Sequence, residues 1–190
     1  MFHCENSKTL VSDIINDDVI KSLMDNDTLG YTRCGGALYG NNMDKYKRDF
    51  NIQLKGLMTF KAQIRNIMFV KKDTFVGYDQ KYKTKQDTYI GTLSVGYSDG
   101  YPRVLSNKGK VRIGNKLYNV VGLVCMDMMM IDIGMDYKEN NIKMGNYAVL
   151  FGPKCQHKLN ITIDDIAKMC DTNNVEIWTK ITKRIPRIFV

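Results

Sequence analysis

The sequence predicts a mainly β domain across residues 50–150, followed by a helical C-terminal segment. Short runs rich in β-branched and aromatic residues support this prediction, and turn residues separate them. Gly114-Asn115 lies between two of these runs and is typical of a β-hairpin turn. The expected strands are residues 54–64, 67–70, 89–95, 110–113, 117–124, 128–133 and 147–151.

The segments on either side of this domain have different patterns. Apolar residues in 10–24 recur at helical spacing, and the polar stretch 41–51 indicates a boundary between domains 1–48 and 49–190. After the strands, Thr162-x-x-Asp165 resembles a capping box and predicts a helix. A last helix or strand pair is expected in residues 175–190.

Composition limits the possible classes of protein. Hydrophobic residues make up 44% of the 190 residues, which suffices for a core. The net charge is +8, from 28 Lys and Arg against 20 Asp and Glu, and the basic residues are scattered. This charge is compatible with solubility alone or with a partner that carries phosphate or carboxylate groups.

Cysteine and histidine usage argues for a cytosolic protein without a metal site. The five cysteines include no Cys-x-x-Cys pair, so reduced thiols are expected. Only His3 and His157 are present, and they give zinc little support. The longest apolar stretch, residues 120–135, is interrupted by two aspartates, so no membrane span is expected. No secretory signal is visible.

Two segments carry candidate functional residues. Residues 91–103 predict a strand that runs into an Asp99-Gly100 turn, with tyrosines and Arg103 at its end. Residues 31–40 contain the pair Gly35 and Gly36, whose bare N–H groups can hold an anion. A loop that simply requires glycine explains the second segment equally well.

Three motifs follow one another along the chain: Val-Gly-Tyr-Ser-Asp-Gly-Tyr-Pro-Arg ending at Arg103, Gly-Leu-Val-Cys-Met-Asp ending at Asp127, and Arg-Ile-Pro-Arg at 184–187. Taken in order, they resemble the C-terminal part of alanine racemase, a family of PLP-dependent enzymes of fold type III. Segments 54–62, 33–40 and 3–7 extend the resemblance upstream. It implies that residues 1–48 are a remnant of the end of a β/α (TIM-like) barrel and that 49–190 are the family's β domain. The lysine that holds PLP lies in an N-terminal half that these residues do not contain.

The resemblance also implies residue roles. Racemisation needs a base on each face of Cα, and in the family a tyrosine from the β domain of the partner subunit provides one of them. That tyrosine precedes the Val-Gly-Tyr motif by about 19 residues, and positions 78 and 97 differ by 19, so the implied base is Tyr78. Tyr97 and Arg103 resemble residues along the substrate's access route. Met126 resembles the position whose backbone N–H meets the substrate carboxylate.

Other residues resemble the family's cofactor site. Arg33 matches the arginine facing the pyridine nitrogen of PLP, and His3 matches the residue supporting it. The phosphate-binding positions correspond to Asn6, Ser7, Gly35 and Gly36. Without the resemblance, each has an ordinary interpretation as a surface cation, a helix cap or a turn.

Three positions depart from the family pattern. Val175 stands where the family has a phosphate-binding tyrosine, Leu123 where it usually has arginine, and Asp79 where it prefers glycine. Together they suggest relaxed constraint, an altered substrate or a decayed gene.

The resemblance thus implies a C-terminal fragment of a cytoplasmic racemase that interconverts L- and D-alanine, a cell-wall precursor, with PLP. A homodimer or a complex with an N-terminal barrel half is expected, and the chain alone is expected to be inactive. The alternative is a non-catalytic module for dimerisation or polyanion binding. In that case Tyr82-Lys83, Tyr101, Arg103 and Tyr118 would stack on nucleic acid, although nucleic acid is not the favoured partner.

Overall fold

A computed structural model describes residues 36–40, 51, 54–154 and 156–189. The chain forms two compact units, Met1–Leu57 and Met58–Val190, which are described separately. In the first unit, Gly36–Tyr39 form the short 3-10 turn η1, and the Leu57 N–H donates to the Tyr39 carbonyl at 3.4 Å. The helix expected in residues 10–24 lies outside the described residues.

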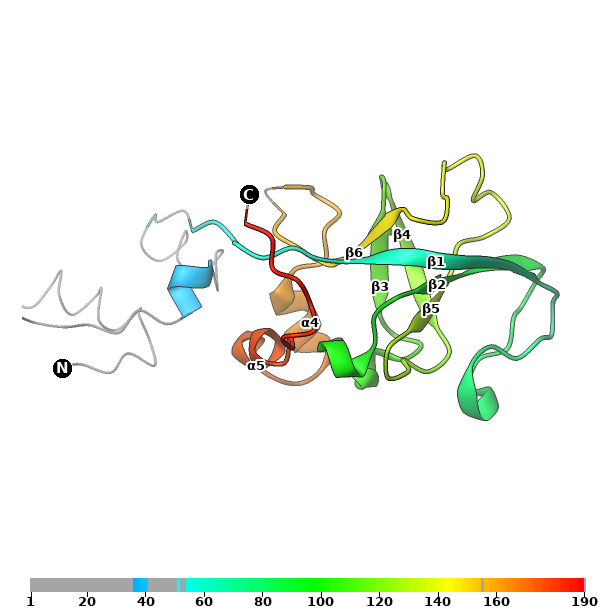
Figure 1. The fold of residues 1–190 in the computed structure, drawn as a ribbon, viewed down its shortest axis with the longest axis horizontal. Coiled ribbons are helices and arrows are strands. Elements are labelled where there is room, and N and C mark those ends of the chain that lie inside the picture. Colours follow the sequence, from blue (N-terminus) through cyan, green and yellow to red (C-terminus); the bar gives the residue numbers. More distant parts are fainter. Residues whose placement is uncertain (1–35, 41–50, 52–53, 155, 190) are drawn as a thin grey trace, which may run out of the picture. The chain divides into compact units, whose positions relative to one another are not determined.

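The second unit is built on a closed barrel of antiparallel strands (Figure 1). The strands follow one another around the barrel in the order β1-β2-β5-β4-β3-β6. Their bounds are β1 Phe60–Val70, β2 Thr88–Leu93, β3 Lys110–Ile113, β4 Lys116–Val121, β5 Met129–Asp132 and β6 Tyr147–Phe151. The mainly β prediction is therefore confirmed.

The long strand β1 closes the barrel by pairing on both sides. Residues 60–63 pair with β6, and residues 64–70 pair with β2. The register shifts between Ile64 and Asn66, as expected of a β-bulge that bends a strand from one partner to the next. The sequence predicted two strands here, in 54–64 and 67–70. That prediction was wrong, because the bulge lets one strand continue through the break in the pattern.

The hairpin of β3 and β4 confirms the turn predicted at Gly114-Asn115, with Ile113 paired to Lys116. Strand β4 was expected to continue to Val124 but ends at Val121. The next residue, Gly122, has φ 75, a left-handed conformation that breaks the pleat and that glycine adopts without steric cost. A Cβ there would also lie 2.8 Å from the Val76 carbonyl oxygen.

Two short helices follow the barrel and share its core. Helix α4, Ile163–Met169, begins at the predicted capping box, in which the Thr162 side chain accepts from the Asp165 N–H and Asp165 accepts in return. Helix α5, Asn174–Thr179, is shorter than the element expected in 175–190. Both helices add side chains to the apolar core, among them Ile166, Ala167 and Ile177.

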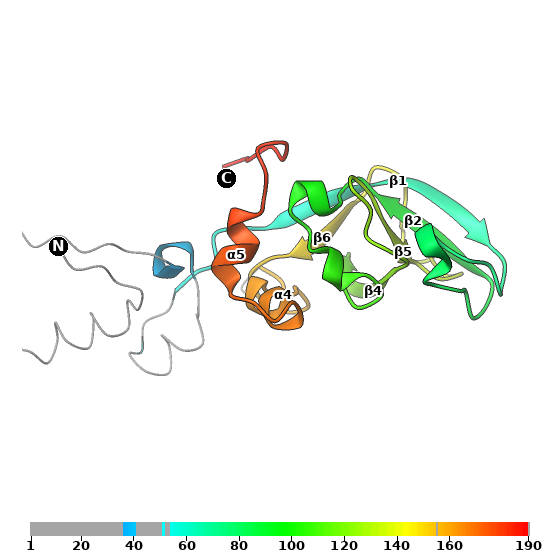
Figure 2. The same ribbon diagram turned by 90° about the horizontal axis from the view of Figure 1, so that it is seen from below.

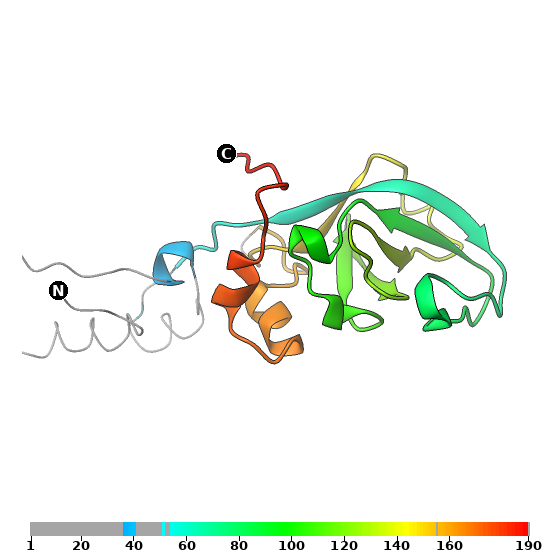
Figure 3. The ribbon, with the colours of Figure 1, turned by 60° about the horizontal axis from the view of Figure 1, so that its bottom comes forward.

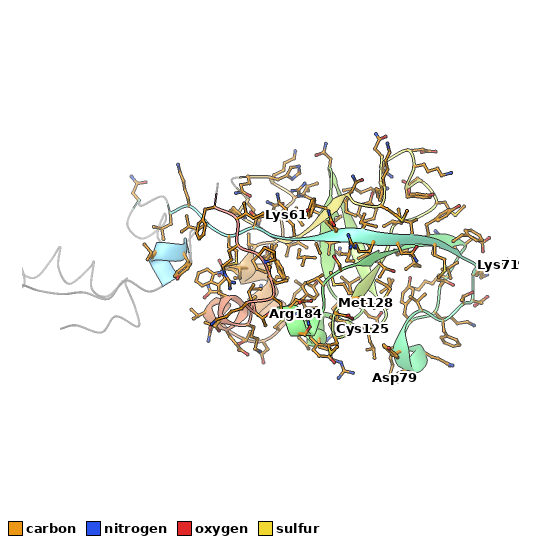
Figure 4. All side chains as sticks on the ribbon, in the orientation of Figure 1. Lys61, Lys71, Asp79, Cys125, Met128 and Arg184 are labelled. Carbon is orange, nitrogen blue, oxygen red and sulfur yellow. The ribbon has the colours of Figure 1, made fainter. Side chains whose placement is uncertain are left out.

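The ends of the barrel differ. Figures 2 and 3 show α4 and α5 side by side at one end, whereas the loop between β1 and β2 projects at the other. Figure 4 places Lys61 near the start of β1 and Lys71 just past its end. Within the described ranges, no helix is long and apolar enough to cross a membrane.

Candidate active-site surface

One hollow of about 480 Å³ on the second unit collects residues from three separate segments. We call it the Tyr78 hollow. It is lined by Tyr78, Asp79, Tyr97, Arg103, Leu123, Val124, Cys125, Met126, Asp127 and Met128. It therefore brings together all four site residues that the resemblance implied for the β domain.

The first segment is the Tyr78 loop, residues 76–82, between β1 and β2. Its ends are joined by a hydrogen bond from the Val76 N–H to the Tyr82 carbonyl at 3.0 Å. Tyr78 begins the 3-10 turn η2, Tyr78–Gln80, and its side chain is 70% exposed. Asp79 has φ 56, a left-handed conformation that glycine adopts without steric cost, so the glycine that the resemblance implied at this position would fit the backbone.

The second segment is the turn that carries Tyr97, in the 3-10 helix η3, Tyr97–Asp99. The Tyr97 N–H donates to the Cys125 carbonyl at 3.0 Å, and the Ser98 N–H donates to the Met126 carbonyl at 2.9 Å. A Cβ at Gly96 would collide with both carbonyl oxygens. Glycine at 96 therefore lets the Tyr97 turn lie directly against the segment that carries Met126.

A buried carboxylate holds this turn in place. Asp99 is 4% exposed, and it accepts from the Gly96 N–H at 3.0 Å. Its other oxygen lies 3.4 Å from Nε of Arg184, which also donates to the Ser98 hydroxyl at 3.2 Å. Arg184, labelled in Figure 4, comes from the Arg-Ile-Pro-Arg motif near the C-terminus, so that motif supports the site without lining it.

The third segment is the Met126 loop, residues 122–128, with Arg103 of the 3-10 helix η4, Arg103–Leu105, beside it. The Met126 side chain is 54% exposed. The backbone carbonyl of Met126 accepts hydrogen bonds from the N–H and the hydroxyl of Ser98. No described residue accepts a hydrogen bond from the Met126 N–H. The Met126 N–H and the Arg103 guanidinium are thus both available to an anion at this surface.

The charges around the hollow are mixed. Arg103 contributes a cation, and Asp79 and Asp127 contribute carboxylates. Burial raises the pKa of the Cys125 thiol, Asp127 raises it further, and Arg103 opposes them. Cys125 is therefore kept as a neutral thiol, which is a poor nucleophile. Of the described residues that line the hollow, none is a lysine, and no cluster of metal-ligating side chains occurs in the described ranges.

Of the residues predicted to bind the cofactor, the structure describes Gly36 alone. Gly36 lies in η1 of the first unit, whereas His3, Asn6, Ser7, Arg33 and Gly35 lie outside the described residues. Of the departures from the family pattern, Leu123 lines the hollow beside Val124. Val175 lies on α5, is 47% exposed and does not line it.

Sequence reasoning missed several lining residues. Cys125, Asp127 and Met128 flank the implied Met126, and the short interval between β4 and β5 was the available clue that all of them share one loop. Figure 4 shows Cys125 and Met128 on the same side of the barrel as Asp79.

The structure corrects two of the residues named for stacking on nucleic acid. Tyr101 is 1% exposed and Tyr118 is 5% exposed, so neither presents a ring face to a base. Tyr82 is half-buried, and its hydroxyl donates to Asp132 at 3.4 Å. Tyr101 and Tyr118 were therefore wrong as stacking residues, whereas Lys83 and Arg103 are exposed.

Comparisons with known proteins agree with this architecture. The profile of the family "Alanine racemase, C-terminal domain" matches residues 57–189. The chain belongs to this family. The alanine racemase of Clostridium novyi is 40% identical over 162 residues, covering 83% of this chain and 40% of that protein. The alanine racemase of Clostridium kluyveri is 34% identical over 186 residues, covering 98% and 46%.

Solved structures of alanine racemases also match this chain. A structure of Bacillus anthracis alanine racemase with bound L-Ala-P matches with a TM-score of 0.76 and 25% identity, covering 99% of this chain and 54% of that one. A Clostridium difficile alanine racemase in complex with cycloserine matches with a TM-score of 0.74 and 27% identity, covering 96% and 53%. The chain thus spans less than half the length of the two clostridial relatives compared by sequence.

Proposed function

We propose that this chain supplies the tyrosine side of a PLP-dependent racemase that interconverts L- and D-alanine. The observation that carries the proposal is the meeting of Tyr78, Tyr97, Arg103 and Met126 around one hollow. Membership of the alanine racemase family supports the reaction type. Two free thiols, Cys125 and Cys170, support a reducing compartment such as the cytoplasm.

The residues of the hollow fit the substrate side of such a site. The Met126 N–H and the Arg103 guanidinium are donors for a carboxylate, and the exposed hydroxyl of Tyr78 is free to exchange a proton with Cα. Tyr97 and Leu123 would border the route by which the amino acid arrives. Bound PLP supplies the electron sink that makes the Cα proton labile.

Covalent attachment of PLP requires a lysine that the described lining does not offer. In this proposal that lysine and the second base come from an N-terminal barrel half, and the working enzyme is an assembly containing both parts. Arg33, His3, Asn6, Ser7, Gly35 and Gly36 are proposed to complete the cofactor site. The 190-residue chain alone is then expected neither to racemise alanine nor to retain PLP.

The test is complementation. The full chain is co-expressed with the N-terminal half of the Clostridium novyi alanine racemase, and α-hydrogen exchange in D2O is followed by NMR from L- and D-alanine separately. Tyr78→Phe should lower racemisation by about 10²–10⁴-fold and abolish exchange from one enantiomer while the other still exchanges. The same change at Tyr97 should leave the ratio of the two exchange rates as in the parent complex.

Two results would contradict the proposal. If the parent complex exchanges the α-hydrogen of neither L- nor D-alanine, the chain is a non-catalytic module. Stoichiometric labelling of one defined lysine, after borohydride reduction of the chain alone with PLP, would show that the chain holds the cofactor without a second part.

A further inference from the structure

The tip of the Tyr78 loop, residues 77–81, has few contacts that fix its position. Its residues are all exposed, and three of them, Gly77, Asp79 and Gln80, have positive φ. Burial therefore does little to hold the tip on the barrel. A base that must reach one face of a small substrate requires a defined position, since misplacement by about 1 Å can cost about 10²-fold in rate.

One side chain ties this tip to the rest of the barrel. The Asn107 amide nitrogen donates to the Lys81 carbonyl at 3.1 Å. Among the hydrogen bonds between described residues, it is the single one that joins residues 77–81 to another segment. The other end of the same amide accepts from the Gly122 N–H at 2.7 Å. Asn107 thus spans the Tyr78 loop and the start of the Met126 loop.

The residue before it extends the connection. The Ser106 hydroxyl accepts from the Val124 N–H at 2.9 Å and donates to the Arg103 carbonyl at 2.6 Å. Ser106 and Asn107 together therefore contact the Tyr78 loop, the Met126 loop and the 3-10 helix η4 that carries Arg103.

The chemistry of position 107 suits asparagine in particular. Its backbone has φ 58, a left-handed conformation that asparagine adopts more readily than most residues. Bridging a carbonyl and an N–H requires a side chain with a donor and an acceptor side by side, which the carboxamide provides. Aspartate has the same shape but can only accept, so it can hold Gly122 and not Lys81.

We propose that Asn107 is a positioning residue for Tyr78: its amide fixes the Tyr78 loop against the Met126 loop and so sets the place of the base relative to the substrate carboxylate. The inference rests on the proposed function for its catalytic consequence. The fastening of the two loops is a property of this chain alone and is tested separately.

The first test is amide hydrogen exchange of the full chain without cofactor, comparing the parent protein with Asn107→Gly and Asn107→Asp. Glycine keeps the backbone conformation and removes the bridge, so exchange at Gly122 should become about threefold to tenfold faster. In Asn107→Asp the carboxylate still accepts from the Gly122 N–H, so this amide should stay protected from exchange. The bond to the Lys81 carbonyl is lost, so proteolysis after Lys81 should accelerate. Asn141→Gly is the matched control, because Asn141 is exposed and has φ 54 in a loop that does not line the hollow.

The second test uses the complemented enzyme. Asn107→Gly and Asn107→Asp should each lower the Tyr78-dependent exchange of one enantiomer by at least about tenfold while exchange of the other changes less than about twofold. Equal losses for both enantiomers would mean general destabilisation and would overturn the positioning role, as would unchanged rates. An inactive parent complex would contradict the proposed function, and in that case unchanged exchange at Gly122 in Asn107→Gly would still overturn the inference.

Discussion

Replacing Tyr101 with phenylalanine should stabilise this protein, although most core substitutions do the opposite. The Tyr101 side chain is 1% exposed, and its hydroxyl has no hydrogen-bond partner among the described residues. It points at Gly109, where even a Cβ would collide with the hydroxyl oxygen. Burying an unpaired hydroxyl costs about 1–3 kcal/mol, and phenylalanine removes that cost while keeping the ring.

At pH 7 the free energy of unfolding should rise by about 1 kcal/mol. This is at the lower end of the cost of the buried hydroxyl, because the variant also loses the packing contacts of the oxygen. Burial is the main cause that raises the pKa of Tyr101, and Cys170 raises it further. An acid whose pKa is raised in the folded state adds stability that is complete below the unfolded pKa of about 10 and is lost as the pH rises above it. At pH 10.5 the parent protein should therefore lose about a further 1 kcal/mol that the Tyr101→Phe variant does not lose.

Urea unfolding of the full chain at pH 7 and pH 10.5 measures both effects. Tyr147→Phe is the control, because that side chain is 57% exposed and its hydroxyl is solvated in both states. Destabilisation by Tyr101→Phe at pH 7 would mean that the hydroxyl has a partner and would refute the argument. If the free energies of unfolding of the parent and Tyr101→Phe differ by the same amount at both pH values, the burial of the Tyr101 hydroxyl is refuted.

Two further measurements probe the supports of the Tyr78 hollow. Asp99→Ala should lower the free energy of unfolding by about 1–3 kcal/mol, because it leaves the buried Gly96 N–H unpaired; a urea midpoint equal to the parent's would count against this role. Alkylation of Cys125, followed by peptide mass spectrometry from pH 7 to 10, should have its midpoint above that of the unfolded chain, since burial and Asp127 raise the thiol pKa. Asp127→Asn should move that midpoint down and Arg103→Ala should move it up, and shifts in the opposite directions would contradict the assigned causes.

Local chemistry made part of the fold predictable. The hairpin at Gly114-Asn115 and the capping box at Thr162 depend on neighbouring residues, and both were predicted with correct positions. The continuous strand β1 was missed, because its register is set by partners far along the chain. The burial of Tyr118 was missed for the same reason, since the face of a strand that turns inward depends on the closed barrel.

The residues of the candidate site likewise differ in whether the sequence alone could reveal them. Tyr78, Tyr97 and Arg103 were named from the resemblance to the family, because a sequence preserves the family's motifs and their spacing without any structure. Asn107 was not named, because its importance comes from a donor and an acceptor on two distant segments. A side chain that acts by holding other segments leaves no local pattern, so the sequence pointed to the residues proposed to face the substrate and not to the one proposed to hold them.

The double pairing of β1 also determines when the barrel can form during synthesis. Lys61 pairs with Val149, so β1 and β6, the first and last strands of the barrel in sequence, lie next to each other. Such contacts of high sequence separation form slowly, because a long intervening chain must be ordered first. Until β6 has left the ribosome, β1 presents an open edge that can pair with other chains. The bulge at Ile64–Asn66, which lets β1 serve both neighbours, thereby makes the barrel depend on chain made after residue 147.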